Sequence, residues 1–321
     1  MRGSRVLVTG AAGFIGSHLV DALLERGAVV RALDNYATGY RENLAHCADR
    51  IEMIEGDIRD LPTCRVACQE VQVVFHEAAL GSVPRSLADP ATTIDVNVGG
   101  TANVFAAARD AGARRVIYAS SSSVYGDSER LPKREGEEGR PLSPYALSKR
   151  MNEELAESFS RCFGMELIGL RYFNVYGPRQ SPEGAYAAVI PRFFAACLSG
   201  QPPVIYGDGR QSRDFTYVAD AVSANLLAAT APRSACGGAY NVAGGSGTSV
   251  IELADLVRET AGGGPPPRFE AARPGDVLHS LADLTRSRDS LGFNAAWTLS
   301  RGLARSRGHY AATASAGTRN A

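Results

Sequence analysis

The stretch Arg5–Gly16, with the sequence RVLVTGAAGFIG, decides the fold class of this chain. Its first residues form a short apolar run typical of a buried strand, and glycines follow at positions 10, 13 and 16. In such a strand–turn–helix unit Gly10 permits the tight turn, Gly13 lets the backbone approach a pyrophosphate, and Gly16 allows close packing of helix on strand. We expect the helix to continue to about Arg26, with its N-terminal N–H groups directed at the phosphates. The stretch therefore predicts the first unit of a dinucleotide-binding sheet.

A second apolar run, Ala28–Leu33, ends in an acid, Asp34. A carboxylate at this point can accept hydrogen bonds from a ribose diol, and its charge repels a further phosphate. The pair of runs therefore favours NAD over NADP as cofactor. Asp57 follows the third expected strand and could contact the adenine edge, or it could be an ordinary turn residue.

Apolar runs typical of strands recur along the first half of the chain, with helical patterns between them, at residues 51–55, 71–75, 115–119 and 167–171. This alternation predicts an α/β fold with a Rossmann-type doubly wound parallel sheet. We expect residues 1–172 to form the NAD-binding domain. Residues 173–300 are predicted to form a smaller C-terminal α/β substrate lobe, with residues 217–230 and 240–242 returning to the first domain.

Residues 302–321 are rich in Arg, Ala, Gly, Ser and Thr and contain almost no large apolar side chain. Such a segment buries too little surface to offset its ordering entropy. The sequence therefore predicts that residues 301–321 form a mobile tail.

Composition excludes several classes of function. The 321 residues carry no net charge, which gives no reason to expect nucleic acid or an anionic membrane as partner. No apolar run is long enough to span a bilayer, and a first strand at Arg5 leaves no room for a signal peptide. The six cysteines form no paired CxxC motif, so no metal site is expected. Reduced, buried cysteines and a cytoplasmic location are the interpretation that we adopt.

A tyrosine and a lysine stand four residues apart in the sequence SPYALSK, residues 143–149. On a helix this spacing places Tyr145 and Lys149 on one face. Ser143 suits the N-cap and Pro144 the first helical position, so that Tyr145 lies in the first turn. The helix dipole and the ammonium both favour phenolate, and we expect them to lower the tyrosine pKa from about 10 towards neutrality. A phenol tuned in this way can take a proton from an alcohol, which predicts carbinol oxidation with NAD as hydride acceptor.

Four consecutive serines, Ser120–Ser123, end the fifth expected strand. The carboxyl ends of parallel strands line the ligand crevice in sheets of this kind. A serine run alone is usually an ordinary loop. In a chain that also contains Tyr145, Lys149 and the glycine loop, it is interpreted as part of the catalytic site.

These motifs together resemble the extended short-chain dehydrogenases/reductases, specifically the NAD-dependent sugar-nucleotide epimerase/dehydratase family. The resemblance runs from Val6 to about Gly292 and includes GAAGFIGSHL, LDNYATG, SSSSVYGD, SPYALSK, LRYFNVYGP, GDGRQSRDF and RPGDVLHS. UDP-hexose 4-epimerases are the most similar members. The subgroup acting on UDP-N-acetylglucosamine is indicated by AALGSVPRS, NVYGPRQ and AYAAVIPRF.

The resemblance implies roles for individual residues. Ser121, Tyr145 and Lys149 correspond to the catalytic serine, the base and its partner. Cofactor contacts are implied for Gly10, Gly13, Phe14, Ile15, Gly16, Asp34, Asn35, Thr38, Gly39, Asp57, Ile58, Ala78, Ala79, Asn97, Ala119, Tyr145, Lys149 and Tyr172. Substrate contacts are implied for Gly81, Ser82, Ser121, Ser122, Ser123, Tyr145, Asn174, Ala188, Val189, Tyr206, Arg213, Arg273, Asp276 and Ser280.

Two of these arginines, Arg213 and Arg273, are expected to hold the UDP with Asp276, since a guanidinium can bind phosphate through two donors. A small residue at Ser280 leaves room for an N-acetyl group. The chain departs from many UDP-galactose 4-epimerases at Gly81, where those enzymes carry a lysine that contacts the cofactor.

The resemblance implies an NAD-dependent UDP-hexose 4-epimerase that inverts carbon 4 through a transient 4-keto sugar. Its substrates would be UDP-GlcNAc/UDP-GalNAc, UDP-Glc/UDP-Gal, or both. A UDP-glucuronate 4-epimerase is an alternative, although the substrate loop offers no obvious cation for a carboxylate between Arg179 and Arg192. A nucleotide-sugar 4,6-dehydratase is less favoured, because its Asp-Glu pair is replaced by Ser122 and Ser123. A non-enzymatic NAD sensor is least favoured, because Tyr145 and Lys149 are both present.

The same resemblance implies a homodimer formed by two helices of each subunit, residues 95–111 and residues 145–163. The apolar residues in these helices could equally belong to the core.

Overall fold

The computed structural model describes residues 1–181, 188–272 and 278–317. Its main feature is a seven-stranded parallel sheet with the strand order β11-β6-β5-β4-β1-β2-β3, which confirms the doubly wound α/β prediction. The order reverses beside β1, and ligands bind at this kind of switch point in open α/β sheets. The strands are β1 (Arg5–Thr9), β2 (Val29–Asp34), β3 (Ile51–Glu55), β4 (Val73–His76), β5 (Arg115–Ser121), β6 (Glu166–Tyr172) and β11 (Gly238–Val242).

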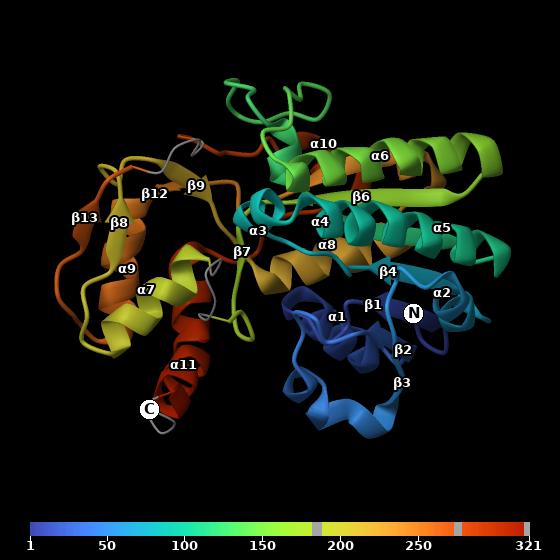
Figure 1. Cartoon of the computed structure of the whole chain (residues 1–321), viewed down its shortest axis with the longest axis horizontal. Coiled ribbons are helices and arrows are strands. Elements are labelled where there is room, and N and C mark those ends of the chain that lie inside the picture. The colour runs from blue at the N-terminus through green and yellow to red at the C-terminus, as the bar shows by residue number, and fades with distance from the viewer. Residues whose placement is uncertain (182–187, 273–277, 318–321) are drawn as a thin grey trace.

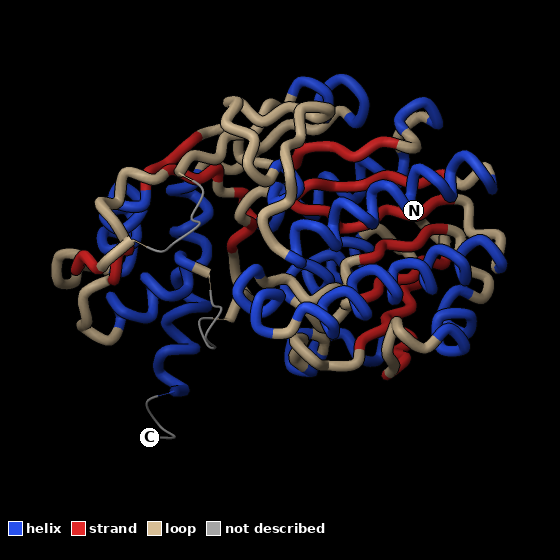
Figure 2. Tube along the Cα trace, turned by 45° about the horizontal axis from the view of Figure 1, so that its top comes forward, coloured by secondary structure: helices blue, strands red, loops and turns tan. Residues whose placement is uncertain are grey.

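Helices cover both faces of this sheet (Figures 1 and 2). Alternate residues of β1 enter different cores: Val6 and Val8 pack with one face, and Leu7 with the other. The first face is covered by α1 (Phe14–Glu25) and α8 (Val218–Thr230). The second face is covered by α2 (Leu61–Cys68), α5 (Gly100–Asp110) and α6 (Pro144–Phe163).

Shorter elements connect these layers. The helical ones are α3 (Val83–Ala88), α4 (Pro90–Ile94), the π-helical turn η3 (Asp95–Gly99), α10 (Thr285–Leu291), and the 3₁₀ segments η1 (Arg41–Asn43), η2 (Ala45–Arg50), η4 (Ser122–Tyr125) and η5 (Arg233–Ala235). Among the described residues, no helix combines the length and the apolar character that crossing a membrane requires.

A smaller second lobe lies beside the sheet, to the left in Figure 1. Its core packs α7 (Val189–Leu198), α9 (Val250–Ala261) and α11 (Leu299–Gly317) together. Three short strand pairs complete it: β7 (Val175–Tyr176) with β10 (Thr216–Tyr217), β8 (Val204–Tyr206) with β13 (Arg268–Glu270), and β9 (Ser212–Asp214) with β12 (Gly247–Ser249). The predicted division into residues 1–172 and 173–300 stays a prediction, and β11 and α8 belong spatially to the large sheet.

Helix α11 stands where the sequence predicted a mobile tail, and the prediction for residues 301–317 is corrected accordingly. Leu303 and Tyr310 are buried, and the Tyr310 ring stacks on Phe194 with 4.8 Å between ring centroids. The Tyr310 hydroxyl also donates to the Gly177 carbonyl over 2.9 Å. Two large residues seven apart lie on one face of a helix, so even a sparse pattern suffices to dock it. Residues 318–321 lie outside the described part.

Candidate functional site

The loop between β1 and α1 is a cradle made of backbone alone. Gly10 has φ of +67°, and a Cβ on it would meet the Ala78 backbone nitrogen at 2.7 Å. A Cβ on Gly16 would lie 2.0 Å from the Gly10 carbonyl oxygen. Gly13 is the N-cap of α1 without a side-chain capping bond, so the N-terminal N–H groups of the helix have no side chain covering them. A pyrophosphate fits this arrangement, and the residues present therefore suit a dinucleotide.

Asp34 ties the cradle to the end of β2. Its carboxylate accepts hydrogen bonds from the backbone N–H groups of Ala12 over 2.9 Å and of Tyr36 over 2.7 Å. Burial raises the pKa of Asp34, while these N–H groups lower it. The carboxylate is thus held at the strand end where a ribose diol would lie.

Asp57, which follows β3, is held in place by two neighbouring side chains. One of them, Arg59, was not identified from the sequence. Asn35 donates to Asp57 over 2.8 Å, and Arg59 donates to the same carboxylate through Nε and Nη2. Hydrogen bonding from Arg59 lowers the pKa of Asp57 to about 2. Asp57 is therefore a fixed charge at the edge of the predicted adenine position.

The loop after β4 is clamped by Asn97 on the π-helical turn. The Asn97 amide accepts from Leu80 N over 2.8 Å and donates to Leu80 O over 3.2 Å and to Ser148 Oγ over 3.0 Å. Ser148 Oγ in turn donates to the Tyr145 carbonyl over 2.7 Å. Asn97 therefore links the loop that contains Ala78, Ala79, Gly81 and Ser82 to the helix that contains Tyr145. Its role as a cofactor contact stays a prediction.

The three predicted catalytic residues come together where β5 ends and α6 begins. Ser121 is the last residue of β5, and its Oγ accepts from Ser123 N over 3.2 Å and from Ser123 Oγ over 2.9 Å. Ser143 caps α6 by accepting from Ala146 N over 3.1 Å, which fixes Tyr145 in the first turn. Lys149 Nζ donates to the Ala119 carbonyl over 2.9 Å.

The expected pKa of Tyr145 was wrong in direction. Burial raises the pKa of Tyr145, and a hydrogen bond with Ser121 lowers it by less. Desolvation disfavours the phenolate, and the Lys149 ammonium donates to a backbone carbonyl. Burial lowers the pKa of Lys149 to about 8, although the carboxylates of Glu77 and Glu153 raise it.

Glu77, directly after β4, is a half-buried acid that the sequence reading passed over. Its Oε1 accepts from the Tyr172 hydroxyl over 2.8 Å, and that hydroxyl accepts from Asn225 Nδ2 over 2.7 Å. Burial raises the pKa of Glu77 to about 7, while Tyr172 and Lys149 lower it. An acid at the end of an apolar strand was the signal that could have identified it. Tyr172, predicted to contact the cofactor, has its hydroxyl engaged within the protein.

A cavity of about 270 Å³ lies in the second lobe, and four predicted substrate residues line it: Asn174, Val189, Tyr206 and Arg213. Arg213 donates to the carbonyls of Ser212 over 3.0 Å and Leu278 over 3.3 Å. The remaining lining residues are Arg192, Phe193, Ala196, Pro202, Val204, Ile205, Gln211 and Val250.

Two further predicted substrate residues lie next to this cavity, and two lie outside the described residues. Ala188 is the N-cap of α7, beside Val189. Ser280 N donates to the Ser212 carbonyl over 3.1 Å, which puts Ser280 next to Arg213. Arg273 and Asp276 lie outside the described residues.

In the described part of the chain, Asp21, His46 and Cys47 place potential metal ligands within 4.8 Å of one another. Each of these three side chains has a contact within the protein that explains its position without a metal ion. Arg179 pairs with Asp21 over 2.8 Å, His46 lies 2.6 Å from the other Asp21 oxygen, and the Cys47 thiol donates to Leu44 O.

Comparisons with known proteins agree with this geometry. The family model described as the NAD dependent epimerase/dehydratase family matches residues 6–243. A UDP-glucose 4-epimerase of Mycolicibacterium smegmatis is 39% identical over 305 residues, which cover 94% of this chain and 96% of that protein.

Solved structures of UDP-sugar 4-epimerases are also similar to this chain. The UDP-N-acetylglucosamine 4-epimerase of Methanobrevibacter ruminantium, in complex with UDP-N-acetylmuramic acid, has a TM-score of 0.93 and 37% identity, covering 98% of this chain and 100% of that one. The UDP-glucose 4-epimerase of Thermus thermophilus, in complex with NAD, has a TM-score of 0.87 and 36% identity, covering 95% of this chain and 98% of that one.

Proposed function

Because the chain belongs to the NAD-dependent epimerase/dehydratase family, we propose that it is a UDP-hexose 4-epimerase with NAD as its cofactor. The observation that carries the proposal is the convergence of Ser121, Tyr145 and Lys149 at the carboxyl edge of the sheet, where Tyr145 is hydrogen-bonded to Ser121 and Lys149 donates to the end of β5. Carbinol oxidation needs a base and a hydride acceptor at one carbon.

The cofactor would be held by residues at the ends of β1 and β2 and by Lys149 on α6. The backbone around Gly10 and Gly13 would bind the pyrophosphate, Asp34 the adenosine ribose, and Lys149 the nicotinamide ribose. NAD bound there would supply the acceptor for a hydride from carbon 4 of the sugar and the source of the hydride that returns.

The side chains of this protein would move the proton and hold the substrate. Tyr145 takes the proton from the 4-hydroxyl, with Ser121 hydrogen-bonded to it, and returns it to the 4-oxygen once the sugar has turned to present its other face. Arg213, with Arg273, would hold the diphosphate while the 4-keto sugar turns. Strong contacts at the nucleotide and weak contacts at the sugar permit this rotation.

A homodimer is the second part of the proposal. On α6, Leu147 and Met151 are 45% and 37% exposed, and on the neighbouring α3 Leu87 is 63% exposed. An apolar surface of this kind suits a helix–helix contact with a second copy. Val104 and Phe105, in the helix predicted at residues 95–111, are core residues and are not part of this surface.

The test is to incubate the purified protein, without added NAD, with UDP-N-acetylglucosamine, UDP-glucose and UDP-glucuronate separately, and to resolve the products by anion-exchange chromatography. The proposal predicts a carbon-4 epimer from at least one of the first two. An epimer from UDP-glucuronate alone would assign the glucuronate reaction, and an accumulating 4-keto product would assign dehydration. No conversion, even with NAD supplied, would refute epimerisation of these sugars.

A further inference from the structure

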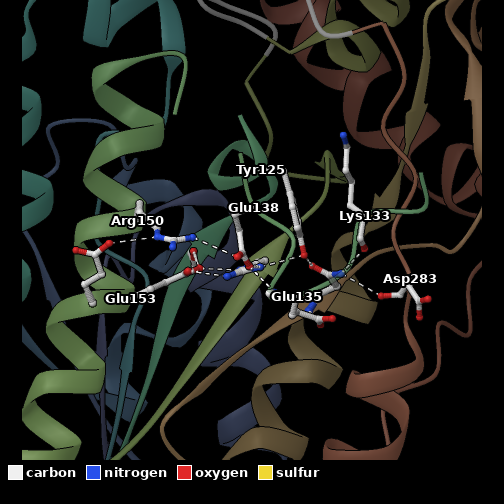
Figure 3. Close-up of polar contacts among 12 residues, drawn as sticks. Tyr125, Lys133, Glu135, Glu138, Arg150, Glu153 and Asp283 are labelled. Carbon is white, nitrogen blue, oxygen red and sulfur yellow. Dashed lines mark hydrogen bonds and ion pairs between the residues drawn. The ribbon is translucent and has the colours of Figure 1, made fainter. Parts of the chain in front are cut away.

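An ion-pair network joins β6, α6 and the segment between β5 and α6, and the proposed chemistry does not use it. Figure 3 labels its members Tyr125, Glu138, Arg150 and Glu153. Its centre is Arg171 on β6, which is buried. The guanidinium donates to Glu153 through Nε and Nη2, each over 2.8 Å, and through Nη1 to Glu138 and to the Tyr125 hydroxyl, the latter over 3.0 Å. Arg171 thus makes two hydrogen bonds to Glu153, a pair called the fork below, and one each to Glu138 and Tyr125.

The first partner ties Arg171 to the catalytic helix and strand. Glu153 lies on α6 one turn after Lys149. The same carboxylate accepts from Ser120 Oγ over 2.6 Å, and Ser120 precedes the catalytic serine on β5. In the sheet Ser120 pairs with Arg171, and Ser121 with Tyr172. The fork therefore fixes α6 against the end of β5, which sets the relative positions of Ser121, Tyr145 and Lys149.

The other partners belong to the chain segments that leave β5 and enter α6. Tyr125 ends η4, and Glu138 lies shortly before the cap of α6 and also pairs with Arg150 over 3.4 Å. The Tyr125 hydroxyl donates to Asn241 Oδ1 over 2.7 Å, and Asn241 Nδ2 donates to Asp283 O over 3.0 Å. The network thereby reaches the segment that pairs with the strand of Arg213.

Glu138 is paired with Arg171 and Arg150 in this network. Burial opposes ionisation of Glu138, but Arg171 and backbone N–H groups outweigh it and lower its pKa to about 2. Replacing a buried ion pair by apolar residues is often neutral for stability, whereas such pairs can specify one arrangement out of several. Positioning is therefore a better account of this network than stability.

We propose that Arg171 is a positioning residue for the epimerase reaction: through Glu153 and Glu138 it holds the catalytic tyrosine and lysine in register with the catalytic serine. This inference rests on the proposed function. A positioning residue acts on turnover, because small misplacements of reacting groups slow the chemical step more than they weaken binding.

The chain contains a matched control at the opposite end of the same two strands. Arg115 on β5 is also buried and donates to Glu166 on β6 through Nε over 2.9 Å and Nη2 over 2.7 Å. Both bonds end on the same oxygen, Oε2 of Glu166, and this ion pair lies away from the carboxyl edge of the sheet.

The experiment compares the wild type with Arg171→Lys and Arg115→Lys, each as purified holoenzyme, by kcat, KM and thermal midpoint. Lysine keeps the charge and loses the fork. We expect Arg171→Lys to lower kcat about 100-fold and to change KM less than about 3-fold. Arg115→Lys should leave kcat within about 2-fold at a comparable loss of midpoint.

Equal kcat in the two variants, or a loss in Arg171→Lys that falls on KM alone, would overturn the inference. Should Arg171→Lys fail to fold, Glu153→Gln replaces it with the same expected loss of kcat, and unchanged kcat there overturns the inference as well. A wild type that forms no epimer refutes the proposed function, whereas an active wild type with equal kcat in the two variants refutes the positioning role alone.

Discussion

Tyr145 lies at the step on which the proposed chemistry depends, the removal of a proton from the sugar hydroxyl. Its first-turn position agrees with the pattern SPYALSK, but its pKa does not follow from that pattern. The spacing of Tyr145 and Lys149 in the sequence predicts the effects of the helix dipole and of the nearby ammonium on this pKa. The loss of water around the phenol depends on neighbours from other elements, and this loss raises the pKa of Tyr145.

Tyr145→Phe should lower kcat about 100-fold or more, the usual scale for removing a general base, with little change in UDP-sugar affinity. Steady-state kinetics and a binding isotherm for UDP check the two parts. Tyr40→Phe, which removes a hydroxyl from a side chain that is 47% exposed, serves as control. Normal turnover in Tyr145→Phe would show that another group is the base.

Lys149 predicts a pH dependence with a definite sign. Burial lowers its pKa to about 8, while Glu77 and Glu153 raise it, so the ammonium is present below this pH and is lost as pH rises through it. If the charged form supports catalysis, kcat falls on the alkaline side of about 8.

Glu77→Gln removes one of the two carboxylates that raise the pKa of Lys149 and should therefore move the alkaline limb of kcat to lower pH. A pH–rate profile measures the shift. Glu70→Gln, at an exposed acid before the same strand, should leave the profile unchanged. A limb that stays in place in Glu77→Gln would separate Glu77 from the charge of Lys149.

At the scale of single residues, the sequence predicts the roles of residues that depend on neighbours close in the chain. The glycine cradle and Asp34 follow from strand, turn and spacing. Arg171 and Glu77 do not, because Arg171 bonds to residues 18 and 33 positions away and Glu77 to one 95 positions away. Such pairings form only when the sheet brings distant strands together.

Among the elements, α6 has the most direct effect on the proposed catalysis, because its N-terminal turn fixes the position of Tyr145. Ser143→Ala removes the N-cap bond and should lower the free energy of unfolding by about 1 kcal/mol. It should also lower kcat about 10-fold, since fraying of the first turn displaces the base.

The matched control is Asp60→Ala, which removes the N-cap of α2, where Asp60 accepts from Thr63 N over 3.0 Å. Urea unfolding and kinetics on both variants separate the effects. A comparable loss of stability with kcat preserved is expected for Asp60→Ala. Equal kcat in the two variants would contradict a special role for the cap of α6.

Element boundaries were predictable where local signals were strong. The sequence placed the first strand, the helix that follows it, and the cap of α6 correctly, since each has a glycine, serine or proline at its edge. It missed α11, because that helix depends on Leu303 and Tyr310 docking against α7 and α9 and not on its own composition. Burial against other elements overrides weak local preference.

For the whole molecule, the exposed apolar face of α6 leads to a prediction of assembly. The wild type should migrate with twice the 33.9 kDa mass of one chain, and Leu147→Glu should give the mass of one chain. A charge in a helix–helix contact is costly, whereas Val66→Glu, at a 52% exposed position on α2, should leave the mass unchanged. Light scattering after size exclusion reads the masses. A dimeric Leu147→Glu would place the interface elsewhere.

Contacts between the two lobes involve residues far apart in the chain, and no local sequence pattern predicts them. His18 on α1 contacts the Pro178 carbonyl over 2.9 Å, and Arg179 N donates to His309 Nε2 on α11 over 2.9 Å. Arg179 also pairs with Asp21 on α1. The segment after β7 is thus bonded to α1 through Pro178 and Arg179 and to α11 through Arg179.

The central claim, inversion at carbon 4 by oxidation and reduction on a retained cofactor, is tested most directly with UDP-N-acetylglucosamine and UDP-glucose carrying deuterium on carbon 4. The substrates are incubated with the purified protein without added NAD, and the products are analysed by nuclear magnetic resonance. The account predicts a carbon-4 epimer that keeps its deuterium on carbon 4. Deuterium lost to water, or found on another carbon of a 4-keto product, would contradict it.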